Sequence, residues 1–240
     1  MKGLSHHKDC FMMQDEKGQS WIYLPEHLLS RFDIPSPIEA KEAVIDWKAQ
    51  SAQYSPYFKK NRIKIPLKDF LPKSKKNLWL RPGPGFGDLS HPTTQLMLQL
   101  MPQNVIRKKI LDIGCGNGIL SLASILFGAI KATGIDIDEK ALYQAKSNAR
   151  LNTLETQTCF SLPKLLCIQS IDVFLMNMIR SEQEKAWEAL PLKLQKGSIG
   201  IVSGILEKEH DLFLRQTEKL GWKAKKTQQL EEWLAYIFET

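Results

Sequence analysis

The chain contains 240 residues, of which 43% are hydrophobic and 25% charged, and its formal net charge is +7. These values are ordinary for a soluble globular protein with one large domain, or with one domain and a small appendage. No apolar run approaches the length of a membrane span, and residues 1–9 contain no apolar signal region. We therefore expect no membrane partner, no export and a cytoplasmic location. The four cysteines are widely spaced and form no CxxC pair: Cys10, Cys115, Cys159 and Cys167. This pattern predicts reduced thiols and no metal site.

Before residue 80 the pattern is interrupted by prolines, and only short elements are predicted. It favours a strand over residues 19–24, helices over 25–32 and 38–48, and strands over 62–67 and 78–81. The prolines in the second half of this region indicate a connector with extended segments rather than a packed domain.

Much of the positive charge lies in residues 57–76. This segment holds eight basic residues and one acid, Asp69. Such a run is typical of a contact with RNA or with the ribosome. It is equally typical of a solvated linker whose lysines keep the chain soluble. Both interpretations stay open, and no contact with DNA is expected.

After residue 90 strands and helices alternate regularly. Helices are expected over residues 92–101, 119–127, 139–151, 181–194 and 207–220, and strands over 109–113, 132–137, 156–160, 171–176, 198–203, 222–230 and 233–239. The strand over 171–176 is almost fully apolar, as is typical of a parallel strand buried on both faces. We predict an α/β fold: a Rossmann-like, doubly wound, mostly parallel sheet of seven strands that ends in an antiparallel pair.

A glycine-rich loop follows the first of these strands, in residues 111–118 (LDIGCGNG). The dinucleotide fingerprint requires a glycine or alanine three positions after Gly116, where Ile119 stands, so that cofactor class does not fit. The Asp112 carboxylate would repel a pyrophosphate but suits an ammonium group. Asp136, at the end of the next strand, is placed to accept hydrogen bonds from ribose hydroxyls. A ligand with an amino-acid end and an adenosine end satisfies both acids, which predicts S-adenosylmethionine as the cofactor.

Four segments, in this order, resemble those of one enzyme family. They are residues 86–94 (FGDLSHPTT), residues 111–118, residues 134–138 (GIDID) with Asn148 and Asn152, and residues 176–179 (MNMI). With the linker-like segment that begins at Asp46, they are similar to the PrmA family of class I S-adenosylmethionine-dependent methyltransferases. The resemblance implies an enzyme that transfers methyl groups to amino groups, on lysine or at the N-terminus, of a ribosomal protein like L11.

The resemblance also implies a domain layout. Residues 1–50 would form a shortened α+β extension for substrate recognition, 51–90 a Pro-rich basic linker that covers the cofactor, and 91–240 the methyltransferase domain. Family members usually carry a compact α+β domain in front, so this part is shortened or rebuilt. Asp88 and Leu89 stand where the family has Thr-Gly. These departures leave cofactor binding intact and put the protein substrate in question.

Asn177 is the predicted catalytic residue, at the end of the strand over 171–176. Methyl transfer from a sulfonium to an amine is an in-line displacement that mainly needs alignment and exclusion of water. The amine must be neutral to attack, and removal from water beside a cation favours that form. An amide such as Asn177 accepts a hydrogen bond from the amine without holding it as an ammonium. The alternative is a turn residue that satisfies its own backbone.

The other candidate site residues carry alternative structural interpretations. By resemblance, His91 and Thr93 lie near the methionine end of the cofactor, although both could simply cap a helix. Phe86 and Gly87 are expected in a mobile lid or in an ordinary surface loop. Cys115 has no neighbouring base in the sequence that would make it a catalytic thiol. The predicted cofactor-binding residues are Asp112, Gly114, Cys115, Gly116, Gly118, Asp136, Ile137, Asn177, Thr93 and His91.

Two other functions are weighed. The basic run motivates an rRNA or tRNA methyltransferase, but Met178 and Ile179 replace the prolines of the motif that such enzymes usually carry, and no aromatic follows to stack on a base. The shortened front part motivates a catalytically lapsed protein that binds the ribosome or another partner. The presence of Asp112, Asp136 and Asn177 argues against this second alternative.

Overall fold

The computed structural model describes residues 11–14, 20–23, 46–55, 57–166, 170–190 and 197–240. The chain divides into two compact units, Met1–Val44 and Ile45–Thr240. In the first unit, β1 (Phe11–Gln14) pairs antiparallel with β2 (Ser20–Tyr23), so the strand expected over 19–24 is present. The helix expected over 25–32 and most of the one expected over 38–48 lie outside the described residues.

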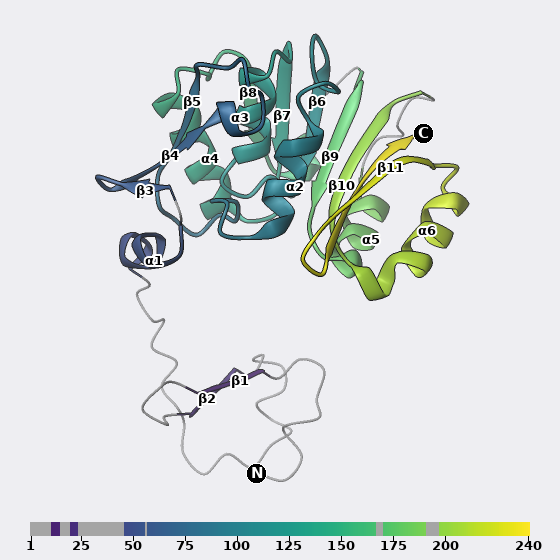
Figure 1. The fold of residues 1–240 in the computed structure, drawn as a ribbon, viewed down its shortest axis with the longest axis horizontal. Helices are drawn as coiled ribbons and strands as arrows, with labels where there is room; N and C mark the ends of the chain where they lie inside the picture. Colours follow the sequence, from purple (N-terminus) through teal and green to yellow (C-terminus); the bar gives the residue numbers. More distant parts are fainter. Residues whose placement is uncertain (1–10, 15–19, 24–45, 56, 167–169, 191–196) are drawn as a thin grey trace. The chain divides into compact units, whose positions relative to one another are not determined.

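The second unit is built on a seven-stranded sheet with the order β11-β12-β10-β9-β6-β7-β8 (Figure 1). The five strands β10, β9, β6, β7 and β8 run parallel, and β12 pairs antiparallel with both β10 and β11. This confirms the predicted doubly wound sheet with its terminal antiparallel pair. The strands are β6 (Lys109–Ile113), β7 (Lys131–Ile135), β8 (Thr158–Ser161), β9 (Val173–Asn177), β10 (Ile199–Leu206), β11 (Lys223–Leu230) and β12 (Trp233–Glu239).

Helices cover both faces of the sheet because the strand side chains alternate between two hydrophobic cores. In β9, Val173 and Leu175 join the core under α2 (Pro92–Leu100), α3 (Ile119–Leu126) and α4 (Glu139–Leu151). Phe174 and Met176 point to the opposite face and join the core under α5 (Arg180–Glu188) and α6 (His210–Lys219). No helix in the described part of the chain is both long and apolar enough to cross a membrane.

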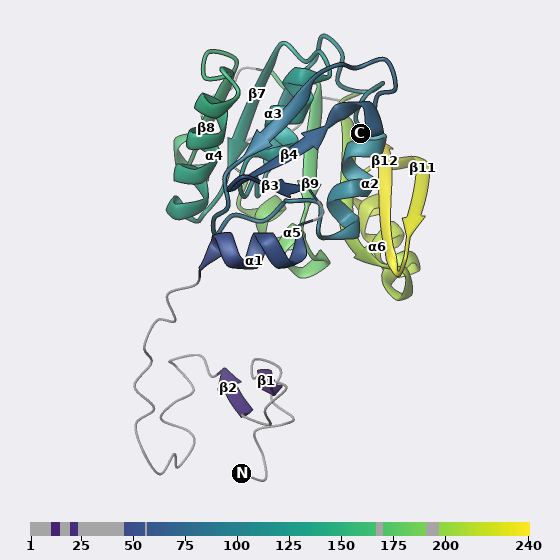
Figure 2. The same ribbon diagram turned by 60° about the vertical axis from the view of Figure 1, so that its left-hand side comes forward.

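A second, smaller sheet differs from the extended connector expected before residue 80 (Figure 2). It follows the short helix α1 (Trp47–Tyr54) and contains β3 (Phe58–Lys59), β4 (Arg62–Pro66) and β5 (Asn77–Leu80), paired antiparallel in that order. Alternate apolar side chains of β4 and β5 are fully buried in the same core as α2, α3 and α4. Strands were predicted at the positions of β4 and β5, but the prolines around them favoured an extended connector over a packed sheet.

The carboxyl ends of β6, β7 and β9 meet at one edge of the large sheet, at Ile113, Ile135 and Asn177. In doubly wound sheets this edge is where ligands bind. The fold therefore brings the glycine loop, Asp136 and Asn177 to one place although they are far apart in the sequence.

Candidate active site

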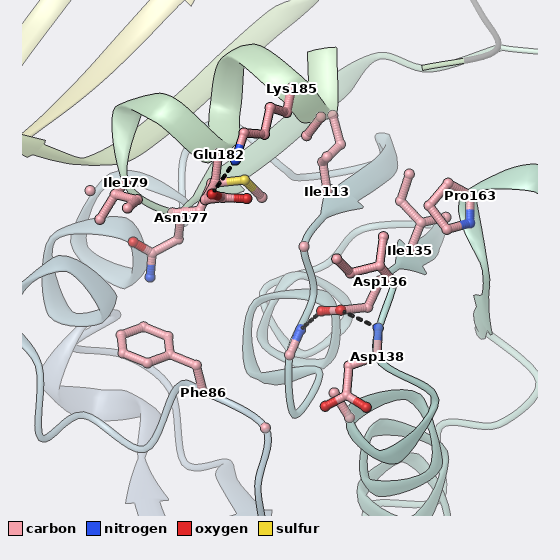
Figure 3. A pocket seen from close by; sticks show the side chains of 18 of the residues that line it. Phe86, Ile113, Ile135, Asp136, Asp138, Pro163, Asn177, Ile179, Glu182 and Lys185 are labelled. Carbon is pink, nitrogen blue, oxygen red and sulfur yellow. Dashed lines mark hydrogen bonds and ion pairs between the residues drawn. The ribbon is translucent and has the colours of Figure 1, made fainter. Parts of the chain in front are cut away.

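A cavity of about 620 Å³ opens at this edge of the sheet (Figure 3). Such a volume is typical of a site for a small organic ligand. Phe86 and Asn177 lie on one side of it and Asp136 on the other. Its walls come from the ends of β6, β7 and β9, the segment over residues 84–86, the first turn of α2, helix α5 and the start of β12.

The glycine loop forms the floor of the cavity through Gly114 and Gly116. Both have positive φ values, of +70° and +53°, which disfavour residues with a Cβ. At Gly116 a Cβ would also meet the Phe86 carbonyl oxygen at 2.7 Å. The segment that covers the cavity therefore lies directly on the glycine loop, and only glycine allows this close approach.

Asp136 ties the second strand to the loop and lines the cavity. Its Oδ2 accepts a hydrogen bond from the Gly116 backbone N–H at 2.8 Å, and its Oδ1 accepts one from the Asp138 backbone N–H at 3.0 Å. Ile137 lies at the rim and is 83% exposed. An acid with an exposed apolar neighbour matches the chemistry of a ribose hydroxyl pair and an adjoining base.

Three of the predicted cofactor-binding residues do not line the cavity: Asp112, Cys115 and Gly118. Asp112 is buried beneath the loop, where its Oδ2 accepts hydrogen bonds from the Ser121 backbone N–H at 3.0 Å and from the Ser121 hydroxyl at 2.7 Å. Burial raises the pKa of Asp112 to about 7, although the bonds from Ser121 oppose the shift. Asp112 thus holds the start of α3, and its contact with a cofactor stays a prediction.

Cys115 and Gly118 belong to the glycine loop but likewise do not line the cavity. Burial, with the carboxylates of Asp112 and Asp136, raises the pKa of the Cys115 thiol well above its ordinary value, so this cysteine is not an activated nucleophile. Gly118 has a φ of +83° and directly precedes α3. Both residues therefore contribute to the conformation of the loop and not to the lining of the cavity.

Asn177 projects into the cavity from the end of β9. Its Nδ2 donates a hydrogen bond to the Thr94 hydroxyl at 3.4 Å, which fixes the amide plane. Its Oδ1 is buried, and it is the one buried side-chain oxygen or nitrogen in the described part of the chain without a hydrogen-bond partner. A buried acceptor without a donor is costly, so Asn177 is prepared to receive an N–H or O–H group.

His91 closes the same side of the cavity within an aromatic cluster. Its ring lies edge-on to Phe86 at 5.5 Å and to Trp233 at 4.8 Å, measured between ring centroids. Its Nδ1 accepts a hydrogen bond from the Thr93 backbone N–H at 3.3 Å, so His91 does cap α2. Burial lowers the pKa of His91, while the carboxylates of Glu232 and Glu231 act in the opposite direction. His91 and Thr93 both line the cavity, so capping and a place in the site coexist.

Three amide side chains, two on α4 and one at its C-cap, hold the covering segment in place; we call Gln144, Asn148 and Asn152 the amide ladder. They stand four residues apart and therefore share one face of the helix. Asn152 accepts a hydrogen bond from the Trp79 backbone N–H at 2.9 Å and donates one to the Trp79 carbonyl at 2.7 Å. Asn148 accepts one from the Arg81 backbone N–H at 2.9 Å.

The ladder continues to the edge of the cavity. Gln144 donates a hydrogen bond to the Arg81 carbonyl at 2.8 Å and accepts one from the Gly85 backbone N–H at 2.7 Å. Asn148 also donates to the Asn117 carbonyl of the glycine loop at 2.9 Å. One helix thus fixes both the floor of the cavity and the segment that covers it.

Sequence reasoning missed several residues of the site. Thr94, whose side chain orients Asn177, appears in the sequence analysis only within the motif of residues 86–94. Trp233 arrives from the carboxyl end of the chain, and Glu182 and Lys185 from α5, where they form an ion pair of 3.0 Å between Lys185 Nζ and Glu182 Oε1 (Figure 3). No local signal marks Trp233, because only the sheet order brings it to the site.

Known proteins match both the sequence and the fold. A family model described as "Ribosomal protein L11 methyltransferase (PrmA)" matches residues 14–240. The ribosomal protein L11 methyltransferase of Aquifex aeolicus (strain VF5) is 34% identical over 209 residues, which cover 85% of this chain and 80% of that protein. The protein of the same name from Laribacter hongkongensis (strain HLHK9) is 36% identical over 183 residues, covering 73% of this chain but only 61% of that relative.

Solved structures share the fold at lower identity. The ribosomal protein L11 methylase of Lactobacillus delbrueckii subsp. bulgaricus has a TM-score of 0.59 at 23% identity, covering 67% of this chain and 83% of that one. Methanocaldococcus jannaschii Trm5, solved with adenosine, has a TM-score of 0.55 at 19% identity, covering 68% and 52%.

The sheet order and the glycine loop at its carboxyl edge define a class I, Rossmann-like methyltransferase. Within that class, the match over residues 14–240 shows that the chain belongs to the ribosomal protein L11 methyltransferase (PrmA) family. The resemblance noted in the sequence is thereby confirmed, and membership implies S-adenosylmethionine as the methyl donor.

Proposed function

We propose that this protein transfers methyl groups from S-adenosylmethionine to amino groups of a ribosomal protein of the L11 type, at lysine side chains or at the N-terminus. The observation that carries the proposal is the buried, unpartnered Oδ1 of Asn177 at the cavity wall. The choice of L11 is supported by the family and by the names of the relatives.

The chemistry of Asn177 favours an amine as the methyl acceptor. A neutral amine offers both an N–H for Oδ1 to accept and a lone pair for attack. A carboxylate at this position would hold the group as an ammonium, which has no lone pair. In the displacement, the N–C bond forms as the C–S bond breaks, and the amine loses a proton to solvent.

The residues around the cavity fit the methyl donor. When bound, S-adenosylmethionine supplies an electrophilic methyl group on a sulfonium. Asp136 offers carboxylate oxygens to the ribose, and the open backbone of Gly114 and Gly116 allows close approach. The aromatic rings of Phe86, His91 and Trp233 exclude water from the side at which Asn177 receives the acceptor.

A labelling experiment tests the proposal. The protein is incubated with methyl-labelled S-adenosylmethionine and either purified ribosomal protein L11 or ribosomes, and the products are separated into protein and RNA. We expect label in L11, located at amino groups by mass spectrometry. Label in rRNA alone would make the protein an RNA methyltransferase, and no binding of S-adenosylmethionine would leave a non-catalytic partner-binding protein.

Asn177→Ala tests the role of the amide. We expect kcat to fall by about 100-fold or more, in line with the loss of a positioning group, while the Kd for S-adenosylmethionine changes less than about threefold. Asn104→Ala is the matched control. The Asn104 side chain follows α2, donates a hydrogen bond to the Leu100 carbonyl and does not line the cavity. A large loss of donor affinity with kcat retained would show that Asn177 holds the donor instead.

A further inference from the structure

The outer face of the small sheet carries basic side chains, and further exposed basic residues lie in the turn and the connection beside it. Arg62 and Lys64 alternate with buried residues along β4 and are exposed. Lys59 and Trp79 are their respective cross-strand partners, so all four side chains lie on one face. We define the basic face as Lys59, Arg62 and Lys64 of the sheet together with the exposed residues of its β3–β4 turn and β4–β5 connection, Lys60, Lys68, Lys73 and Lys75.

This charge is not balanced by neighbouring acids. No residue of the basic face forms an ion pair within the described part of the chain. The one acid of the segment, Asp69, accepts a hydrogen bond from the Tyr57 hydroxyl at 2.9 Å. Lys76 is excluded from the set because its Nζ donates to the Leu126 carbonyl at the end of α3, at 3.3 Å. The seven remaining cations are therefore available to an external polyanion.

The surroundings of the basic face narrow the kind of partner. The large apolar side chains that are exposed in the described part of the chain all lie outside residues 57–80. The face therefore offers nothing to insert into a bilayer and no apolar anchor for a protein partner. Its one aromatic, Trp79, lies beneath the Lys64 ammonium, 5.4 Å from the ring centroid. A folded sheet with several exposed cations and, among the described residues, no neighbouring ion pairs fits a phosphate backbone.

We propose that the basic face binds the phosphate backbone of RNA without reading its sequence. The choice of RNA over other polyanions rests on the proposed function, because a ribosomal protein substrate is met beside rRNA. β5 runs from the basic face to Arg81 and the segment that covers the cavity. RNA held on this sheet would thus keep a ribosomal particle near the cavity and raise the encounter rate.

Fluorescence anisotropy with a labelled, mixed-sequence RNA of about 20 nucleotides tests the inference, without S-adenosylmethionine or protein substrate. The test variant is Lys59→Gln with Arg62→Gln and Lys64→Gln. The matched control is Lys219→Gln with Lys223→Gln and Lys226→Gln, three exposed lysines at and beyond the end of α6. Both variants lose the same net charge, so a difference between them reports position rather than total charge.

We expect the test variant to bind the RNA at least about tenfold more weakly at 50 mM salt, and the slope of log K against log salt to shrink by about 2. The control should stay within about twofold of the wild-type protein. Equal losses in both variants, or no RNA binding by the wild-type protein, would overturn the inference. So would a difference between the variants that appears only with phosphatidylserine vesicles or oligo-glutamate.

The inference and the proposed function fail separately. Methylation of free L11 in the absence of RNA should proceed at the wild-type rate in the test variant, because none of its three positions lines the cavity. If the wild-type protein binds RNA but does not methylate L11, the proposed function alone is wrong. Weakened RNA binding in the test variant, with methylation of free L11 unchanged, would support both.

Discussion

Asn177 combines a fixed orientation with an unused acceptor. Thr94 engages the Nδ2 of the amide, so rotation of the amide plane would break that bond, and Oδ1 is held in place. A folded protein tolerates such a group where binding or catalysis uses it. The catalytic hypothesis for this site therefore rests on one oxygen atom, Asn177 Oδ1.

Asn177→Asp provides a pH test of that hypothesis. An anion beside the acceptor favours the ammonium form and raises the amine pKa by about one unit or more. The rising limb of kcat against pH should therefore move to higher pH by a similar amount. The measurement is a pH–rate profile between about pH 6 and 10 with saturating substrates. An unchanged limb would mean that residue 177 does not face the amine.

Asp112 makes the stability of the fold depend on pH. Its folded-state pKa, raised to about 7 by burial, lies above the value of about 3.9 expected in the unfolded chain. The folded protein therefore binds more protons than the unfolded one between these values, so stability falls as the pH rises from about 4 to about 7 and levels off above pH 7.

Asp112→Asn should remove this dependence. We expect the free energy of unfolding of the wild-type protein, relative to the variant, to fall by on the order of 2 kcal/mol between pH 5 and pH 8. Urea unfolding at several pH values measures it. Asp138→Asn is a suitable control, because Asp138 is exposed. A constant difference across this range would contradict a raised pKa at Asp112.

At the scale of elements, α4 acts on the site without contributing a reacting group. Its amide ladder binds main-chain groups from Trp79 to Gly85, and Gln144 is the rung nearest to the cavity. The ladder carries the covering segment to the glycine loop, where Phe86 contacts Gly116. The geometry of the donor site therefore depends on a helix whose first turn lines the cavity through Ala141 but supplies no reacting group.

Gln144→Ala should separate binding from turnover. It removes two hydrogen bonds, at about 1 kcal/mol each, so KM for S-adenosylmethionine should rise by about 5- to 30-fold, while kcat at saturation changes less than about threefold. Gln144→Glu keeps the acceptor for Gly85 and should recover part of the affinity. Gln157→Ala, on an exposed glutamine, is the control. A fall in kcat with KM unchanged would contradict a positioning role.

The sequence predicted the elements that follow local periodicity and missed contacts that join distant segments. The strands, the glycine loop and Asp136 follow from apolar runs and from the residues at their ends. The ladder pairs residues up to 73 positions apart, so no local pattern reveals it. α5 ends at Glu188, earlier than the 181–194 helix predicted, and residues 191–196 lie outside the described part of the chain.

For the whole second unit, the small sheet is part of the main core. Ile63, Ile65, Leu78 and Leu80 are buried together with side chains of α2, α3 and α4. The sheet should therefore unfold with the large sheet in one cooperative transition, rather than melt separately as a linker would.

Ile65→Ala tests whether the small sheet and the large sheet unfold in one transition. A large-to-small change at a fully buried isoleucine costs about 2–5 kcal/mol, and the loss should appear equally in far-UV circular dichroism and in tryptophan fluorescence. Ile130→Ala, at a side chain that is 56% exposed, should change stability by less than about 0.5 kcal/mol. Separate transitions in the two signals would show that the small sheet folds independently.

The amide ladder has a consequence for how this enzyme can diverge. Its rungs recognise peptide groups, which every residue except proline presents in the same way. Between Trp79 and Gly85 the exposed Arg81 can therefore be exchanged while the clamp holds, whereas Leu80 is fully buried and a Cβ at Gly83 would meet Gln144 at 2.5 Å. Acceptor specificity can therefore drift at position 81 at little cost to donor binding, so this exposed side chain is the natural place to graft recognition of a different amine.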